Sequence, residues 1–389
     1  MGIKAAIVHA KFAPFHLARL ESAGKLASES GNTLHGIEIA DSENDYGWRV
    51  NRYNGNSFFH HVVFPNEEIH RIPYTSLRLE LSRCLDRIGP DVVVLPGWTA
   101  PGRAGLVWAL SRRVRRVLMS DSQKVDHRQG LLRKQVKRML VRRFQSGFAA
   151  GTPHVKWLEE LGLSGNRCRT GCDVVDNAFF QRPAGESLGR HPDDAPTLIS
   201  CIRLLPRKNV FRILECLAGR TSQWKWMIVG DGPERQEIQQ RIVELDLAER
   251  VTVAGHVPYS ELPALYASAH VYIQPSIVEQ WGLAVNEAMA SGLPVLVSNR
   301  CGCREDLVRE GINGFTFDPF DESGIADALT RMLERRSEWA PMGEASRSII
   351  ASWDVGRFAS GFWAACQLAI GEPERRSTRL TDRVVRLCL

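Results

Sequence analysis

The sequence of 389 residues lacks long apolar runs and paired cysteine motifs. No uninterrupted apolar stretch approaches the roughly 18 residues that cross a bilayer, so we expect no membrane-spanning segment. Residues 1–5 lead directly into a strand-like segment and do not resemble a secretory leader, so we expect a cytoplasmic protein. The nine cysteines form no Cys-x-x-Cys pair, which argues against a disulfide framework and against a structural zinc site.

Aromatic residues are also scarce, at 8%, while apolar residues make up 44% of the chain and charged residues 24%. This composition is typical of a globular chain and excludes a disordered or fibrous one. At roughly 100–200 residues per domain, the length predicts two or three domains. The net charge of +6 is unevenly spread, because residues 111–144 hold twelve Lys and Arg but only two acids.

Short apolar or β-branched segments alternate with helical stretches along the chain. The strand-like segments of the first half lie at residues 5–10, 34–40, 60–64, 91–96 and 114–120. Strand and helix recur at lengths that suit parallel crossover units, so a parallel sheet with helices on both faces is expected. A segment rich in Pro, Gly and charge at 183–196 is typical of a linker, and the alternation resumes from residue 197 to residue 297.

These patterns predict an α/β protein with two doubly wound, Rossmann-like domains that face each other across a cleft. The first domain is expected to span residues 1–182 and the second residues 197–365. Ligands of open parallel sheets bind beyond the carboxyl ends of the strands. An active site is therefore expected between the two domains.

A basic loop and a glycine turn in the second half precede predicted helices. Arg203 and Lys208 follow a predicted strand, where a rigid guanidinium, an ammonium group and helix N–H groups suit a diphosphate. A basic surface turn is the alternative.

The next loop contains Gly230 in a Gly-x-Gly turn. The large Arg235 stands where a dinucleotide-binding fingerprint needs a small residue, which argues against a nicotinamide site.

The most informative segment is the loop and helix at residues 275–287. Glu279 lies in the loop, Gly282 at the start of the helix and Glu287 in its second turn. Gly282 lets the backbone approach a ligand closely, and the first N–H groups of the helix can bind a phosphate. Glu287 would then accept hydrogen bonds from a ribose. In the alternative interpretation, both acids are solvated surface residues.

Five motifs in this order resemble the donor-binding domain of family 4 retaining glycosyltransferases with the GT-B fold. They are Arg203 with Lys208, residues 230–233, residues 255–257, Glu279 with Glu287, and residues 288–295. The resemblance spans about Leu198 to Pro319 and is weaker in the first half of the chain. It implies that the first domain binds the acceptor and that residues 366–389 cross back to it.

The resemblance implies a role for each matching residue. Arg203 and Lys208 would bind the leaving diphosphate, and Glu279 the donor sugar. The other donor-binding residues would be Gly230, His256, Val257, Gly282, Leu283 and Glu287. The family often has a His after the fifth strand, where this chain has Asp121 and Ser122. The segment that holds Phe15, His16 and Arg19 resembles the first loop of the family. The candidates on the acceptor side are therefore Phe15, His16, Arg19, Asp121 and Ser122.

The implied function is a retaining transfer of a hexose-type sugar from a nucleotide-diphosphate sugar, with UDP favoured over GDP. The acceptor would be a glycan, a lipid-linked molecule or a small molecule. The sequence has no Asp-x-Asp motif to hold a metal on the diphosphate, so neither a metal nor another cofactor is expected. Two alternatives stay open: a nucleotide-sugar epimerase with the same fold, and a catalytically silent nucleotide-sugar-binding protein.

A basic amphipathic helix is predicted at residues 130–144. Its basic face includes Arg133, Lys134, Lys137 and Arg138. Such a helix can lie on an anionic membrane surface, which would make the protein peripheral to the inner face of the cell membrane. Alternatively, its apolar stripe packs under the first domain. A second basic stripe occurs at residues 375–386. We expect no nucleic-acid binding, because no aromatic stacking motif accompanies the charge.

Overall fold

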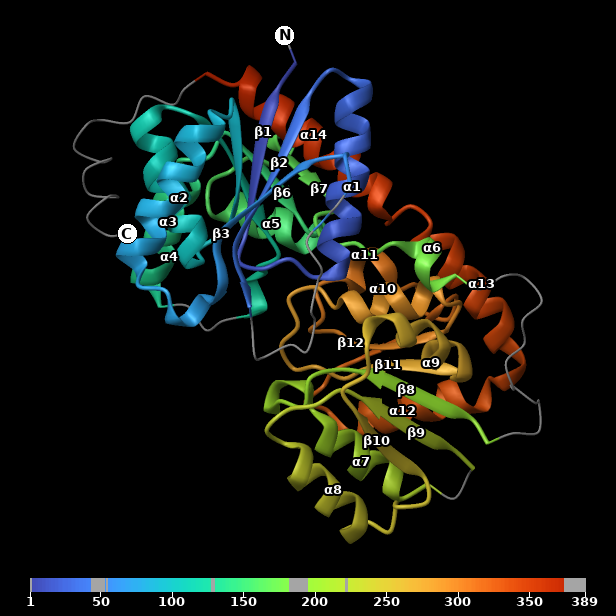
Figure 1. Cartoon of the computed structure of the whole chain (residues 1–389). Helices are drawn as coiled ribbons and strands as arrows, with labels where there is room; N and C mark the ends of the chain where they lie inside the picture. Colours follow the sequence, from blue (N-terminus) through green and yellow to red (C-terminus); the bar gives the residue numbers. More distant parts are fainter. Residues whose placement is uncertain are drawn as a thin grey trace. The chain divides into compact units, whose positions relative to one another are not determined.

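The computed structural model describes residues 2–42, 53, 55–126, 130–181, 195–220 and 223–373. The chain divides into two compact units, each built around a parallel sheet (Figure 1). Unit 1 comprises Met1–Val174 and Val355–Leu389, and unit 2 comprises Val175–Asp354. The predicted α/β class with two parallel-sheet domains is confirmed. The cleft between them stays a prediction.

The sheet of unit 1 has seven parallel strands in the order β3-β2-β1-β4-β5-β6-β7. The strands are β1 (Lys4–His9), β2 (Thr33–Ser42), β3 (Phe59–Glu68), β4 (Val92–Pro96), β5 (Arg115–Ser120), β6 (Ser146–Ala149) and β7 (Cys168–Thr170). Strands β1 and β4 lie in the middle and are almost wholly apolar and buried. This is expected of parallel strands with helices on both faces.

Helices cover both faces of this sheet (Figure 1). On one face lie α1 (Pro14–Glu29) and α14 (Val355–Gly371). The other face carries α2 (Tyr74–Ile88), α3 (Ala100–Arg112), α4 (Leu131–Val141) and α5 (Thr152–Glu160). Helix α14 is buried through its aromatic residues: the Phe358 ring lies 5.2 Å from the Phe148 ring, and Trp363 Nε1 donates to Ala23 O at 2.8 Å.

The division between the units differs from the predicted boundaries. The chain returns to unit 1 at Val355, whereas the sequence placed residues up to 365 in the second domain. The reason is that the aromatic residues of α14 pack in unit 1. The short helix α6 (Asn177–Phe180) belongs to unit 2, where the Phe180 ring lies 5.9 Å from the Tyr266 ring. Most of the predicted linker, and all of residues 374–389, lie outside the described residues.

The sheet of unit 2 has six parallel strands in the order β10-β9-β8-β11-β12-β13. The strands are β8 (Thr197–Cys201), β9 (Lys225–Val229), β10 (Val251–Gly255), β11 (Val271–Gln274), β12 (Val295–Ser298) and β13 (Gly314–Phe317). One face packs on α7 (Val210–Ala218), α8 (Arg235–Glu244) and α12 (Glu322–Glu334). On the other face, α10 (Leu283–Ala290) packs on β11 and β12, and α6, α9 (Leu262–Ser268) and α13 (Trp339–Ile350) pack against α10.

Candidate functional site

The predicted donor-binding residues lie at the switch point of the unit 2 sheet. Strand β8 pairs with β9 on one side and with β11 on the other, so the connections after β8 and β11 run in opposite directions. Ligands of doubly wound sheets bind at this point, beyond the carboxyl ends of the strands. Arg203 and Lys208 follow β8, and Glu279 and Gly282 follow β11. The loops that follow β8 and β11 are therefore neighbours at the carboxyl edge of the sheet.

A contact between Lys208 and Glu279 joins the two loops. Lys208 lies in the 3-10 helix η4 (Pro206–Lys208) and is 9% exposed, and its Nζ donates to Glu279 Oε2. The same oxygen accepts from Gln274 Nε2 at 2.9 Å and from Ser276 Oγ at 3.0 Å. These contacts fix the position of the Glu279 carboxyl group and hold Lys208 Nζ at the switch point.

Glu279 is supported by a row of polar side chains that was not predicted from the sequence. Tyr272, Gln274 and Ser276 are alternate residues, so they point to one face of the extended chain. Tyr272 OH donates to Gln274 Oε1, and Gln274 Nε2 also donates to Ser276 Oγ at 2.8 Å. All three side chains are buried. Polar residues at every second position of an otherwise apolar strand are the signal that could have identified them.

Gly282 sets the start of α10. Its φ of 105° and ψ of 62° lie in the left-handed region, which favours glycine. The first N–H groups of the helix, those of Leu283 and Ala284, have no intrahelical acceptor and carry the positive end of the helix dipole. Nearby, Trp281 Nε1 donates to Asn286 Oδ1 at 2.9 Å, which fixes the loop on the helix. This end of α10 suits a negatively charged group.

Glu287 is buried on α10 and bonded to α9. Tyr266 OH donates to Glu287 Oε2 at 2.6 Å. Burial raises the pKa of Glu287 from 4.5 to about 7, and the hydrogen bond from Tyr266 opposes this rise. The carboxyl group therefore changes between its neutral and ionised forms near neutral pH. The predicted surface alternative for Glu287 is wrong, because the side chain is only 7% exposed.

Gly230 shapes the β9 loop. A Cβ atom at this residue would lie 1.9 Å from Ile202 O, and φ is +134°. Its N–H donates to Gly255 O at 2.8 Å, which joins the loop that follows β9 to the end of β10. Gly230 therefore lets the β9 loop lie directly against the segment that carries Arg203. These contacts give Gly230 a packing role, and its predicted role in donor binding stays a prediction.

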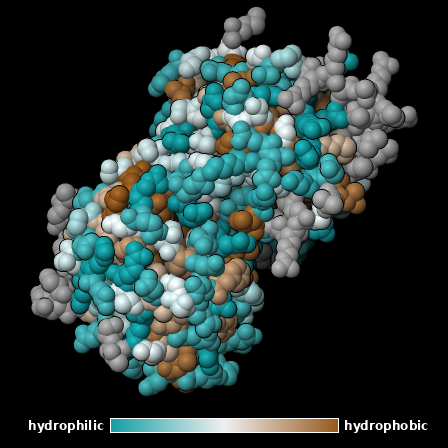
Figure 2. Space-filling view, turned by 180° about the vertical axis from the view of Figure 1, so that it is seen from behind, coloured by the Kyte–Doolittle hydropathy of each residue, from teal (hydrophilic) through white to brown (hydrophobic). Residues whose placement is uncertain are grey.

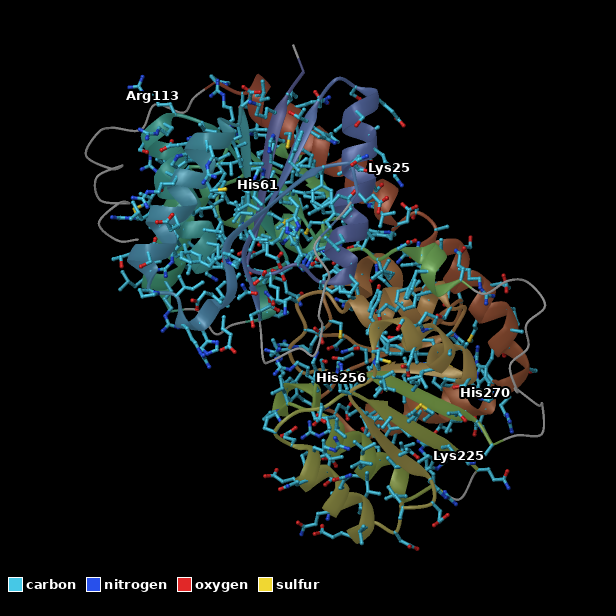
Figure 3. All side chains as sticks on the ribbon, viewed as in Figure 1. Lys25, His61, Arg113, Lys225, His256 and His270 are labelled. Carbon is cyan, nitrogen blue, oxygen red and sulfur yellow. The ribbon has the colours of Figure 1, made fainter. Side chains whose placement is uncertain are left out.

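His256 and Val257 follow β10. His256 is exposed and Val257 half-buried. Figure 3 shows His256 at the carboxyl edge of the sheet, whereas Lys225 and His270 lie at the opposite edge. All the predicted donor-binding residues thus lie on one edge of unit 2.

In unit 1, the predicted acceptor-side residues gather around Arg19. This residue of α1 is 3% exposed, and its Nε donates to Val174 O at 2.8 Å. A terminal nitrogen lies 3.4 Å from Asp173 Oδ1, and the guanidinium carbon lies 4.9 Å from the centre of the Phe15 ring. Arg19 therefore supports the loop after β7, and its predicted place on the acceptor side stays a prediction.

Asp121 follows β5 and faces the same cluster. Burial raises the pKa of Asp121 to about 7, the negative charge of Asp173 adds to this rise, and Arg19 opposes it. The neighbouring Ser122 is buried, and its N–H donates to Ser120 Oγ at 3.3 Å. A carboxyl group with a raised pKa thus lies at the carboxyl end of β5.

Two neutral imidazoles lie at the end of β1. The rings of His9 and His16 are 4.5 Å apart, and Ala13 N–H donates to His16 Nδ1 at 2.9 Å. Burial lowers the pKa of His9 to about 3 and also lowers that of His16, and Arg19 adds to both effects. His9 was not predicted, although a polar residue that ends a buried apolar strand was a usable signal.

The predicted basic helix is α4, and only part of its predicted apolar stripe is buried. Leu140 and Phe144 are buried, whereas Leu132 is 80% and Val136 39% exposed. Among the predicted cations, Arg133 is exposed, whereas Lys134, Lys137 and Arg138 are half-buried. Two of them lie over tryptophan rings at 5.4 Å, Lys134 over Trp157 and Lys137 over Trp98.

Helix length and surface hydropathy bear on the membrane prediction. None of the helices in the described part of the chain is long and apolar enough to cross a bilayer. On the face that Figure 2 shows, apolar surface forms separate small patches.

Part of the chain matches a known family. The sequence model of the family described as Glycosyl transferases group 1 matches residues 187–349. The lipopolysaccharide core biosynthesis glycosyltransferase LpsE of Rhizobium meliloti (strain 1021) is 30% identical over 214 residues, which are 55% of this chain and 58% of LpsE. The GDP-mannose-dependent alpha-(1-6)-phosphatidylinositol monomannoside mannosyltransferase of Mycolicibacterium smegmatis is 34% identical over 164 residues, 40% of this chain and 43% of that enzyme. The chain thus matches about half the length of these relatives.

Solved structures are similar over nearly the whole chain. Sucrose-phosphate synthase from Thermosynechococcus elongatus has a TM-score of 0.74 at 17% identity and covers 94% of this chain and 98% of its own. HepE of Anabaena in complex with UDP and glucose has a TM-score of 0.71 at 18% identity, with 94% and 99% covered. Residues 187–349 therefore match the group 1 glycosyl transferases, and the two parallel-sheet units have the fold of GT-B glycosyltransferases.

Proposed function

We propose that the chain is a retaining glycosyltransferase that moves a hexose-type sugar from a nucleotide-diphosphate sugar to a glycan, lipid-linked or small-molecule acceptor. The observation that carries this proposal is the Lys208–Glu279 contact beside the start of α10, at the switch point of unit 2. The family match covers these residues. UDP is the favoured nucleotide, and a solved structure of similar fold holds UDP and glucose.

Departure of a diphosphate leaves negative charge on the leaving group and positive charge on the sugar. Cations and helix N–H groups beside the diphosphate stabilise this charge more in the transition state than in the ground state. We assign this role to Arg203, Lys208 and the N-terminus of α10. Glu279 would contact the donor sugar and Glu287 the ribose, with the nucleobase near His256.

Two features of the chemistry belong to the same proposal. The sequence contains no Asp-x-Asp motif, so we assign the charge on the diphosphate to the side-chain cations. In a retaining transfer on one face of the sugar, the leaving phosphate takes the acceptor proton, so no carboxylate is assigned as general base. Turnover that vanished on treatment with EDTA would contradict this mechanism.

The acceptor site belongs, in this proposal, to the cluster at the carboxyl ends of β1 and β5. Neutral imidazoles such as His9 and His16 both donate and accept hydrogen bonds, and the half-buried Phe15 offers a ring face. Asp121 adds a carboxyl group. This chemistry suits the hydroxyl groups of a sugar or a polyol.

The variant Lys208→Ala tests the function. Loss of one charge-stabilising donor typically lowers kcat by 10²–10³, and we expect a decrease of this size in transfer from UDP-glucose, with the fold retained by circular dichroism. Lys225→Ala is the matched control, because Lys225 is exposed at the opposite edge of the sheet (Figure 3). Near-normal turnover of Lys208→Ala would contradict the proposal. Sugar epimerisation without an acceptor would favour the epimerase instead.

We also propose that α4 binds an anionic membrane surface. Leu132 and Val136 lie one turn apart and are exposed, and Arg133 lies between them. Apolar side chains that are solvated and flanked by cations are typical of helices that lie in the lipid interface. The protein would then be cytoplasmic and peripheral to the membrane.

A further inference from the structure

An open cavity of about 680 Å³ lies in unit 2, at the sheet edge opposite the donor loops. Its wall includes His270, which precedes β11, and Pro294, which precedes β12. The rest comes from the 3-10 helix η6 (Arg336–Glu338), from α13 and from Gly292. Figure 3 shows His270 at this edge and His256 at the other. The four residues of β11, roughly 13 Å, separate the cavity from the loop that carries Glu279.

The polar groups of the cavity wall are mainly hydrogen-bond donors. Arg336 and Arg347 bring guanidinium groups, and Ser337 a hydroxyl. Thr197 N–H donates to His270 Nδ1 at 3.1 Å, so the hydrogen of the neutral ring lies on Nε2. The acid on the wall, Glu344, pairs with Arg347 and offsets its charge, so the wall keeps the positive charge of Arg336. A wall of this kind favours an anion.

Arg347 is held in place beside the cavity. Its terminal nitrogen donates to Ser291 O at 3.2 Å, in the turn that ends α10. The guanidinium carbon lies 2.2 Å from the position that a Cβ atom at Gly292 would occupy, so the absent side chain leaves room for Arg347. A cation already ordered by such contacts loses little conformational entropy when a ligand binds.

The apolar part of the wall comes from Trp339, Pro294 and Pro341. Trp339 is 8% exposed, its Nε1 donates to Met332 O at 3.0 Å, and Arg336 lies 5.7 Å from its ring centre. The volume lies in the range of small-molecule sites and exceeds what a bare phosphate fills. A ligand that matches both parts of the wall carries an anionic group on a compact organic body.

We propose that this cavity is a second ligand site, separate from the donor site, for a phosphate monoester of a compact organic molecule. Arg336 and Arg347 bind the phosphate, because guanidinium groups form paired hydrogen bonds with its oxygens. The organic body lies against Trp339 and Pro341. A sugar phosphate and a nucleoside monophosphate both carry a phosphate monoester on a compact organic body.

Isothermal titration calorimetry of the full chain, with excess UDP present, tests the proposal. The probes are glucose 6-phosphate, AMP and inorganic phosphate. We expect one equivalent of at least one monoester to bind, and Arg336→Glu to weaken it at least tenfold. Arg241→Ala, which removes a half-exposed arginine on α8, is the control and should bind like the wild type.

The outcomes separate this proposal from the glycosyltransferase proposal. The only purpose of UDP is to keep the probes out of the donor site. Even if UDP does not bind, weaker binding of the probe to Arg336→Glu assigns that binding to the cavity. Two results overturn the proposal: no binding of either monoester, or binding that Arg336→Glu leaves unchanged. Inorganic phosphate that binds as tightly as both monoesters also overturns it, because the organic body would then make no contact.

Discussion

The position of the Glu279 carboxylate depends on side chains from the end of β11, from its own loop and from the loop that follows β8. Gln274 Nε2 and Ser276 Oγ both donate to Glu279 Oε2, and Lys208 donates to the same atom. A hydrogen bond to a charged group contributes about 1.5–3 kcal/mol. We therefore expect Gln274→Ala to lower kcat for transfer from UDP-glucose by roughly 10- to 100-fold, because Glu279 loses its fixed position.

Two variants within the polar row, Tyr272→Phe and Gln274→Ala, can be compared. Tyr272→Phe removes only the bond that orients Gln274, so its effect on kcat should be smaller than that of Gln274→Ala. Urea denaturation of both variants would show whether the fold is retained. Full turnover in Gln274→Ala would contradict the positioning role of this row.

The raised pKa of Glu287 makes stability depend on pH. Because the folded state binds the proton more tightly than the unfolded state, stability is greatest below pH 4.5, falls as the pH rises, and the loss is complete above pH 7. Glu287→Gln has no charge to lose. Between pH 5 and pH 8 the variant should gain about 2–3 kcal/mol in the free energy of unfolding relative to the wild type.

Urea denaturation at the two pH values measures this difference. Other titrating groups, Asp121 among them, are the same in both proteins and cancel in the comparison. Glu249→Gln, at an exposed position, is the control for the substitution itself. A constant difference between Glu287→Gln and the wild type would mean that Glu287 is ionised at both pH values.

At the scale of elements, α4 carries the membrane prediction. Leu132→Glu places a negative charge on its exposed apolar surface and removes a side chain that contributes about 1.5–3 kcal/mol when buried. We expect at least a tenfold loss of binding to vesicles that contain phosphatidylglycerol, measured by flotation. Val243→Glu on α8 is the control, because Val243 is 70% exposed in unit 2. Wild-type protein that stays off these vesicles at low salt would contradict the proposal.

The elements differ in how well the sequence predicted them. The predicted start of the helix at Gly282 and the five predicted strands of the first half agree with the structure to within a few residues. Strands β6, β7 and β13 were missed. Each has only three or four residues, too few for a period-two pattern, and they exist because their backbone pairs with a neighbouring strand.

At the scale of the whole molecule, unit 1 is built from two separate parts of the sequence. Phe358, Phe362 and Trp363 of α14 are buried in it and together contribute about 5–9 kcal/mol, against a net stability of about 5–15 kcal/mol. A chain that ends at Asp354 should therefore lose the folded unit 1. Thermal denaturation followed by circular dichroism would show the loss, with Ser360→Ala, exposed on the same helix, as a control. If both units of the shortened chain still showed a melting transition, this prediction would be wrong.

The sequence alone determined the class of fold and the edge of unit 2 that carries the donor residues. Strand and helix periods predict a parallel sheet, and loops after parallel strands meet at one edge whatever the packing in detail. Tertiary structure decided which partners those residues have. Glu279 meets Lys208 across 71 positions of sequence, and Glu287 meets Tyr266 across 21. Burial and long-range contact set the pKa values, and local pattern contains neither.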